Sequence, residues 1–231
     1  MGEKSVVGAE AVKGCLLNFK LKEQCPDVPN EDINKVARAI ASKAELTTRE
    51  GKRSKRSENS LRTKLKDREY TDEEIESIMD IRNTEFVIKR ENGEDIVLKR
   101  HGYLKEEDGQ SHHLNQDAAF KDVIPTDEAI TIKLEGNILT EKDSSHYKAH
   151  EAMEAFWDDY REPDGKYMDE MPTIQQYNEA LNGSMLNAGF TNDEADLIVE
   201  VAAHQQRAFG LNETDDVLRI PGKINSIERK D

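Results

Sequence analysis

Residues 129–160, AITIKLEGNILTEKDSSHYKAHEAMEAFWDDY, place a strand signal directly before a helix signal. Apolar and polar side chains alternate from Ile130 to Leu134, which is the period of a strand with one buried face. Gly136 and Asn137 follow and are typical of a turn. The first part of the stretch therefore predicts a half-buried strand that ends in a tight turn.

The second part predicts a helix from Ser145 to Tyr160. Its large apolar side chains recur at helical spacing, so we expect them to pack into the core. These positions are Ala149, Met153, Phe156, Trp157 and Tyr160.

Upstream of this stretch, the chain carries a hairpin signal. Two apolar runs, residues 86–88 and 96–98, flank the dipeptide Asn92-Gly93. Asn-Gly favours the tight turns that join antiparallel strands. We therefore expect a second pair of strands here.

Two helix starts are marked in the first third of the chain. Asn30 begins an amphipathic pattern over residues 31–44, and Thr71 with Glu74 forms a capping-box pair that starts a short helix. Between them, residues 49–68 hold nine Lys or Arg against three acids, a run that suits a loop or an exposed helix.

Two further helices are expected after a loop that is rich in Pro and Gly. The first runs from Thr173 to about Ala188 and ends at Gly189. The second begins at Thr191, with Glu194 as its capping-box partner. Together they predict a helical hairpin.

The overall composition excludes a membrane span and argues at first against a nucleic-acid ligand. Hydrophobic and charged residues each make up 35% of the 231 residues, and no run approaches the roughly 18 apolar residues that a span needs. No secretory signal is visible at the start of the chain. The net charge is −15, but it is uneven: residues 151–200 hold thirteen acids, whereas residues 49–68 are basic. A chain so polarised can still offer a basic surface to DNA.

Four of the six histidines lie between positions 112 and 150. His146 and His150 are four residues apart on the expected helix, so both imidazoles project from one face and can bind one metal ion. His112 or His113 could supply a third ligand and give a three-ligand site with an open position. Adjacent side chains of an extended backbone point to opposite sides, so only one of the two would face the metal.

The order His112-His113, strand, Asn137, His146-x3-His150 resembles the HNH, or ββα-metal, nuclease motif, with a spacing similar to that of the colicin-type DNases. The segments HHLNQDAAFKDVIP, GNILTE and HYKAH also resemble the nuclease domains of bacterial polymorphic toxins. The likeness covers roughly residues 100–161 and extends more loosely through the C-terminal helices. Two features differ from the colicin-type DNases. The gap of 23 residues between His113 and Asn137 is longer here, and Gln110 stands where those enzymes have an acidic residue.

This resemblance implies an α+β fold with a ββα-metal core and flanking helices. It implies that His112, His146 and His150 hold one divalent ion (Zn, Ni, Co, Mn or Mg). It implies that His113 is the general base, activating water, and that Asn137 orients the His113 ring. Residues 1–70 would be a helical segment with a basic run, and residues 71–231 the nuclease domain with its helical hairpin.

The function implied is that of an endonuclease toxin, a hydrolase that cleaves DNA in competing bacteria. Such an effector would leave its producer by a specialised system without a signal peptide, act in the target-cell cytoplasm, and have a cognate immunity protein. Two alternatives stay open: a non-catalytic interaction module stabilised by metal, and an HNH nuclease that is not a toxin. Three histidines without cysteine are unusual for a structural zinc site, which favours catalysis.

Overall fold

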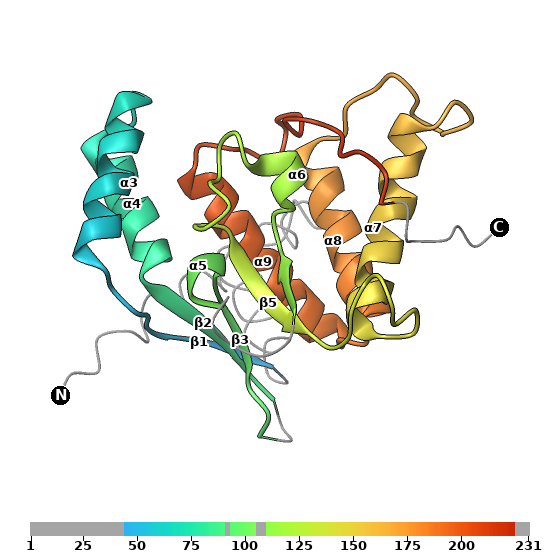
Figure 1. Cartoon of the computed structure of the whole chain (residues 1–231), viewed down its shortest axis with the longest axis horizontal. Coiled ribbons are helices and arrows are strands. Elements are labelled where there is room, and N and C mark those ends of the chain that lie inside the picture. Colours follow the sequence, from blue (N-terminus) through green and yellow to red (C-terminus); the bar gives the residue numbers. More distant parts are fainter. Residues whose placement is uncertain (1–43, 91–92, 105–109, 225–231) are drawn as a thin grey trace, which may run out of the picture.

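The computed structural model describes residues 44–90, 93–104 and 110–224. Within them, one antiparallel sheet combines with two groups of helices, so the coarse expectation of an α+β fold is confirmed (Figure 1). The elements are β1 (Glu45–Glu50), α3 (Lys55–Asp67), α4 (Asp72–Arg82), β2 (Thr84–Lys89), β3 (Ile96–Arg100), α5 (His101–Leu104), β4 (Gln110–His113), α6 (Asp117–Phe120), β5 (Ile130–Leu134), α7 (Ser145–Arg161), α8 (Ile174–Asn187) and α9 (Asn192–Ala208).

The sheet has five strands in the order β1-β2-β3-β5-β4, and every neighbouring pair is antiparallel. The expected hairpin is present as β2 and β3, with Val87 opposite Val97. Strand β4 forms one edge and pairs only with β5 among the described strands, with His112 opposite Ile132. The histidine pair therefore lies on an edge strand, beside the strand that alternation predicts.

Local signals set the helix starts. Thr71, Thr173 and Thr191 cap α4, α8 and α9, and each forms a reciprocal capping box with the residue three positions on. Each box satisfies two backbone N–H groups that the first helical turn leaves without partners. The helix starts predicted at Thr71 and Thr191 are thereby confirmed, and Gly189, with a φ of 99°, follows α8 as expected.

In Figure 1, α3 and α4 lie at one end of the molecule and α7 and α8 at the other, while α9 runs behind the sheet between them. Helix α9 contacts α4 and β2 as well as α8, and α8 packs on α7. The core between them includes the apolar faces of β2, β3 and β5. In α7, Ala149, Met153 and Trp157 are fully buried, whereas Phe156 is only partly buried.

The basic run, residues 49–68, covers the last residues of strand β1 and the whole of helix α3. This helix is amphipathic and buries Leu61 and Leu65. Since β1 pairs with β2 and these leucines join the common core, residues 45–67 share the sheet and core of the rest of the described chain. The expected helix over 31–44 lies almost wholly outside the described residues, and a domain boundary near residue 70 stays a prediction.

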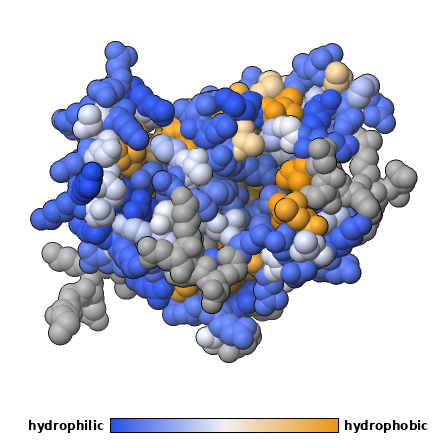
Figure 2. All heavy atoms as spheres, viewed as in Figure 1, coloured by the Kyte–Doolittle hydropathy of each residue, from blue (hydrophilic) through white to orange (hydrophobic). Residues whose placement is uncertain are grey.

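The molecular surface is largely polar. Figure 2 shows one face on which hydrophilic residues dominate and apolar residues appear in small groups. None of the described helices has the length and apolar character needed to cross a membrane.

Candidate metal centre

The start of α7 is fastened to the end of β5. The N–H of His146 donates to the Glu135 carbonyl at 3.1 Å, and the N–H of Glu135 donates to Ser145 Oγ at 3.1 Å. Gly136 makes this turn possible, because its φ is 86° and any Cβ there would collide with Ser144. The turn that the sequence predicts thus determines where α7 begins and where His146 lies.

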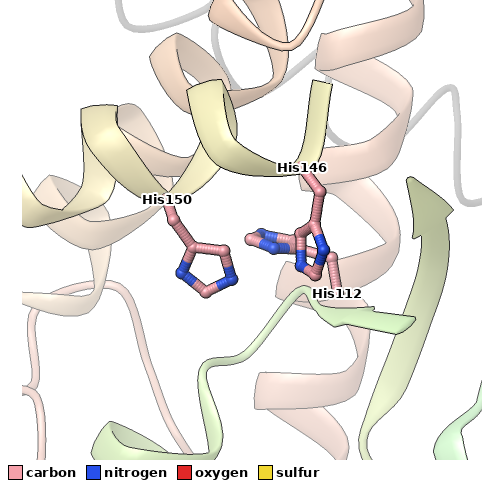
Figure 3. A group of neighbouring side chains, drawn as sticks. All are labelled: His112, His146 and His150. Carbon is pink, nitrogen blue, oxygen red and sulfur yellow. The ribbon is translucent and has the colours of Figure 1, made fainter. Parts of the chain in front are cut away.

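Three imidazoles converge where α7 crosses β4. His146 and His150 point from α7 towards His112 of β4 (Figure 3). One potential ligand atom from each of the three lies within 4.8 Å of the others. The ring centroids are 5.6 Å apart for His112 and His146, 4.8 Å for His112 and His150, and 4.9 Å for His146 and His150.

These imidazoles are short of hydrogen-bond partners. Both ring nitrogens of His112 and of His146, and Nδ1 of His150, are buried without a partner among the described residues. A buried polar atom left without a partner costs free energy, so such atoms usually mark a missing ligand, ion or water. One nitrogen from each of the three rings, all within 4.8 Å of one another, suits a cation that imidazole binds.

Burial also keeps the three rings neutral. It lowers the pKa of His112 well below 6.5, and the neighbouring histidines act in the same direction. Burial lowers the pKa of His150 to about 4. Burial lowers the pKa of His146 too, although the nearby backbone of Gly136 offsets part of that shift. Neutral imidazole is the form that binds a metal.

His113 occupies the other side of strand β4. It lies opposite Thr131 in the β4–β5 pair, whereas His112 lies opposite Ile132, so the two rings project to opposite faces. The His113 ring packs against His101, with centroids 4.5 Å apart and planes at 40°. His101 Nδ1 in turn lies 3.0 Å from Ser111 Oγ. His113 therefore lies on the opposite face from His112 and has neighbours of its own, yet it is near enough to contribute to the lowered pKa values of His112 and His150.

Asn137 lies in the turn after β5. Its Oδ1 accepts the N–H of Leu139 at 2.8 Å, and its carbonyl accepts the N–H groups of Thr140 and Glu141. A hydrogen bond from Asn137 to the His113 ring remains a prediction. The neighbouring Ile138, rather than Asn137, is among the described residues that line the cavity beside the histidines.

One cavity of about 560 Å³ lies beside β4. His112, His146 and His150 line it together with His113, so the structure brings all four predicted histidines to one space. Its other described walls come from β4, β5, α6, α7 and the C-terminal segment: Gln110, Ser111, Gln116, Asp117, Ala118, Lys133, Ile138, Glu154, Pro221, Gly222 and Ile224.

Glu154 belongs to the same face of α7 as the two ligand candidates. It follows His150 by one helical turn and is buried, 6% exposed. Its Oε2 accepts the N–H of Ile224 at 3.0 Å and bonds to Arg161, whose Nη1 donates to the Pro221 carbonyl at 3.1 Å. Glu154 thereby fixes the C-terminal segment against the cavity.

Buried polar side chains of α8 and α9 hold the loop after His113. The N–H of Gln116 donates to Tyr177 Oη at 2.9 Å, and Tyr177 Oη donates to the Leu114 carbonyl at 2.6 Å. Gln206 Nε2 donates to Asn115 Oδ1 at 2.7 Å. Helices α8 and α9 thus position the residues that follow the histidine pair.

Four basic residues lie near the histidine motif in sequence and are candidates for phosphate contact: Arg100, Lys105, Lys121 and Arg161. Two of them bond to other groups of the fold. Arg100 is buried, donates from Nη1 to both carboxylate oxygens of Glu128 at 3.0 Å, and stacks on the Tyr103 ring. Arg161 pairs with Glu154 and Asp158. Both guanidinium groups are therefore engaged in ion pairs within the fold. The other two candidates are Lys121, which is exposed, and Lys105, which lies outside the described residues.

Several cavity residues were not predicted. Glu154 could have been found, since it continues the four-residue spacing of His146 and His150. Gln116 and the segment 221–224 carry no local signal, because only the fold brings them to the histidines.

Neither a protein-family model, nor a curated protein, nor a solved structure matches the chain. The chemistry of the site is therefore inferred from its own residues.

Proposed function

We propose that the chain is a metal-dependent endonuclease of the ββα-metal (HNH) type that hydrolyses DNA phosphodiester bonds. The observation that carries the proposal is the convergence of His112, His146 and His150 beside a cavity that His113 also lines. The succession of two paired strands and a helix, β4, β5 and α7, is compatible with such a core.

The three imidazoles fit a divalent cation. Five of their six ring nitrogens are buried without a partner among the described residues, the rings are neutral, and three nitrogen ligands would leave a coordination position for substrate or water. Such donors favour Zn²⁺, Ni²⁺ or Co²⁺ in affinity, whereas Mg²⁺ or Mn²⁺ are further candidates for turnover. A bound ion would stabilise the charge on the phosphoryl group and on the leaving oxygen.

His113 supplies the base. Its ring accepts a proton from a water molecule as the water oxygen bonds to phosphorus, and the bond from phosphorus to O3′ breaks. The departing O3′ takes up a proton from solvent, which leaves a 5′-phosphate and a 3′-hydroxyl, and His113 then returns its proton to solvent. Packing of His113 on His101 limits rotation of the ring and so keeps the base in place.

The biological role we propose is that of a toxin effector in bacterial competition, delivered by a specialised system and acting on DNA in the target-cell cytoplasm. A producing cell would then need an immunity protein. Expression of the chain alone should block growth, and co-expression of the gene immediately downstream should restore it. Growth unaffected by the active nuclease would contradict the toxin role.

A plasmid-nicking assay tests the activity. With divalent metal, the wild-type chain should convert supercoiled plasmid to open circles, EDTA should stop the reaction, and added metal should restore it. His113→Ala should be slower by about 10²–10⁴-fold. Metal binding without any cleavage would contradict the proposal and favour a metal-stabilised interaction module.

A further inference from the structure

The side chain of Gln116 is held in one orientation at the wall of the cavity. Its Oε1 accepts the indole N–H of Trp157 at 2.6 Å. Trp157 is fully buried, and an indole N–H can only donate. The oxygen of the Gln116 amide must therefore face Trp157.

This orientation leaves the amide nitrogen for another partner. Nε2 carries two N–H donors, and it donates to no acceptor among the described residues. It is also not among the buried unsatisfied atoms, so it has access to solvent. Because Gln116 is partly buried and lines the cavity, the accessible donors belong to the cavity wall.

The surroundings of this donor suit an anion. Lys133 lines the same cavity, and a cation held by the neutral imidazoles of His112, His146 and His150 would add positive charge. The two acids of the wall already accept hydrogen bonds: Asp117 from Thr126, and Glu154 from Arg161 and Ile224. A fixed amide donor beside positive charge matches an oxyanion better than a neutral acceptor.

We propose that Gln116 Nε2 forms a subsite for a non-bridging phosphate oxygen of the substrate. The identity of the anion rests on the proposed nuclease function, whereas the orientation of the amide does not. Gln116 then fixes the phosphodiester beside His113 by a donor that needs no reorganisation, because Trp157 already holds it.

Gln116→Glu is the variant that tests this subsite. A carboxylate keeps an oxygen for the Trp157 N–H but replaces the amide donors with a second, anionic oxygen. The zinc-loaded proteins are titrated with the dinucleotide thymidylyl-thymidine, followed by calorimetry. We expect the variant to bind it roughly tenfold or more weakly, as a hydrogen bond to a charged group is lost. Zinc affinity should be unchanged.

Two controls separate the subsite from general effects. Gln175→Glu adds the same charge on the exposed face of α8 and should leave dinucleotide affinity unchanged. Fluorescence of Trp157, the single tryptophan, should match between wild type and Gln116→Glu if the loop is intact. In the wild type, the Gln116 side-chain NH₂ resonances should shift on dinucleotide addition.

The outcomes distinguish this subsite from the proposed function. Equal dinucleotide affinity in wild type and Gln116→Glu, with an unchanged Gln116 NH₂ resonance, overturns the subsite. Selective weakening in Gln116→Glu supports it even if plasmid is never cleaved, in which case the nuclease proposal alone fails. A zinc-loaded wild type that does not bind the dinucleotide also overturns the subsite, and plasmid nicking then decides the nuclease proposal separately.

Discussion

Adjacent histidines acquire different chemistry from the alternation of a strand. His112 turns towards α7 and is buried, 1% exposed, among the other imidazoles, whereas His113 packs on His101 across the strand. A strand reverses side-chain direction at every residue, so neighbours in sequence are assigned to opposite faces. This separation allows one histidine to bind metal and the next to exchange a proton.

Metal titration beside plasmid cleavage should separate these roles. His113→Ala should lose most activity but keep nearly the wild-type metal affinity. His146→Ala or His150→Ala should weaken metal binding, with activity partly recovered at high metal concentration. Asn137→Ala should fall between, slowing cleavage without loss of metal. If His113→Ala loses the metal and His112→Ala retains it, the two neighbours have been assigned the wrong way round.

The lowered pKa values predict acid sensitivity of the metal-free protein. Above pH 6.5 the histidines are neutral in both the folded and the unfolded chain, so their burial adds no pH dependence. Below pH 6.5 the unfolded chain binds protons that the folded site excludes, and the free energy of unfolding therefore falls. For His150, whose folded pKa is about 4, this loss is roughly 3 kcal/mol by pH 4.

Urea denaturation in EDTA from pH 4 to pH 8 measures this effect. His150→Asn removes one of the titrating rings and should show a smaller loss of stability than wild type between pH 6.5 and pH 4. His204, whose pKa burial and Arg207 also lower, is common to both proteins and cancels in the comparison. Parallel curves for the two proteins would contradict the prediction.

At the scale of elements, buried amides join α8 and α9 to the strands of the site. Gln206 donates from Nε2 to Asn115 Oδ1 at 2.7 Å and to Asn178 Oδ1 at 2.8 Å. Gln205 accepts the N–H of Ile130 at 3.0 Å and donates to the Glu128 carbonyl at 2.8 Å. The helical hairpin is thus part of what positions β4 and β5.

Gln206→Ala should destabilise the fold. It leaves Asn115 Oδ1 and both the oxygen and the nitrogen of the Asn178 amide without the partners that Gln206 supplies, at a cost of roughly 1–3 kcal/mol for each unpaired group. Chemical denaturation at pH 7 measures the change. Gln175→Ala, on the exposed face of α8, should change stability by less than about 0.5 kcal/mol. Equal effects of the two substitutions would show that the network contributes little.

The elements that the sequence predicts are those with local causes. Thr71 and Thr191 cap helices through residues three positions away, and the alternation from Ile130 to Leu134 needs only one buried face. Strand β1 was not predicted, since its pairing with β2 joins residues about forty positions apart. The contact between Gln116 and Trp157 is likewise non-local, and no sequence pattern in either segment predicts it.

At the scale of the whole molecule, the charge is divided between the two ends. Helix α3 carries much of the basic run, and α7 carries part of the acidic stretch 151–200 together with two candidate metal ligands. These helices stand at opposite ends in Figure 1. A duplex that contacts both would therefore have to lie across the molecule.

Several charges of the basic run are already neutralised within the fold. Arg62 pairs with Glu76 at 2.5 Å, Lys66 with Asp72 at 3.1 Å, and Arg53 with Glu50 at 3.0 Å. Lys55 and Arg56 are exposed and form no ion pair with the described residues. Lys64 is likewise exposed on α3, but Lys55 and Arg56 are adjacent in the first turn of the helix, and they are the two that we expect to reach phosphates.

Lys55→Gln with Arg56→Gln should lower DNA affinity and weaken its dependence on salt. Each phosphate contact contributes about −0.9 to the slope of log K against log salt, so losing two should reduce its magnitude by about 1.8. Fluorescence anisotropy with a labelled duplex in EDTA, from 50 to 200 mM salt, measures the slope without cleavage. Lys166→Gln removes a charge in the acidic stretch and should leave the slope unchanged. A slope that is the same in the double variant and in wild type would place α3 outside the DNA footprint and leave binding to the residues around the cavity.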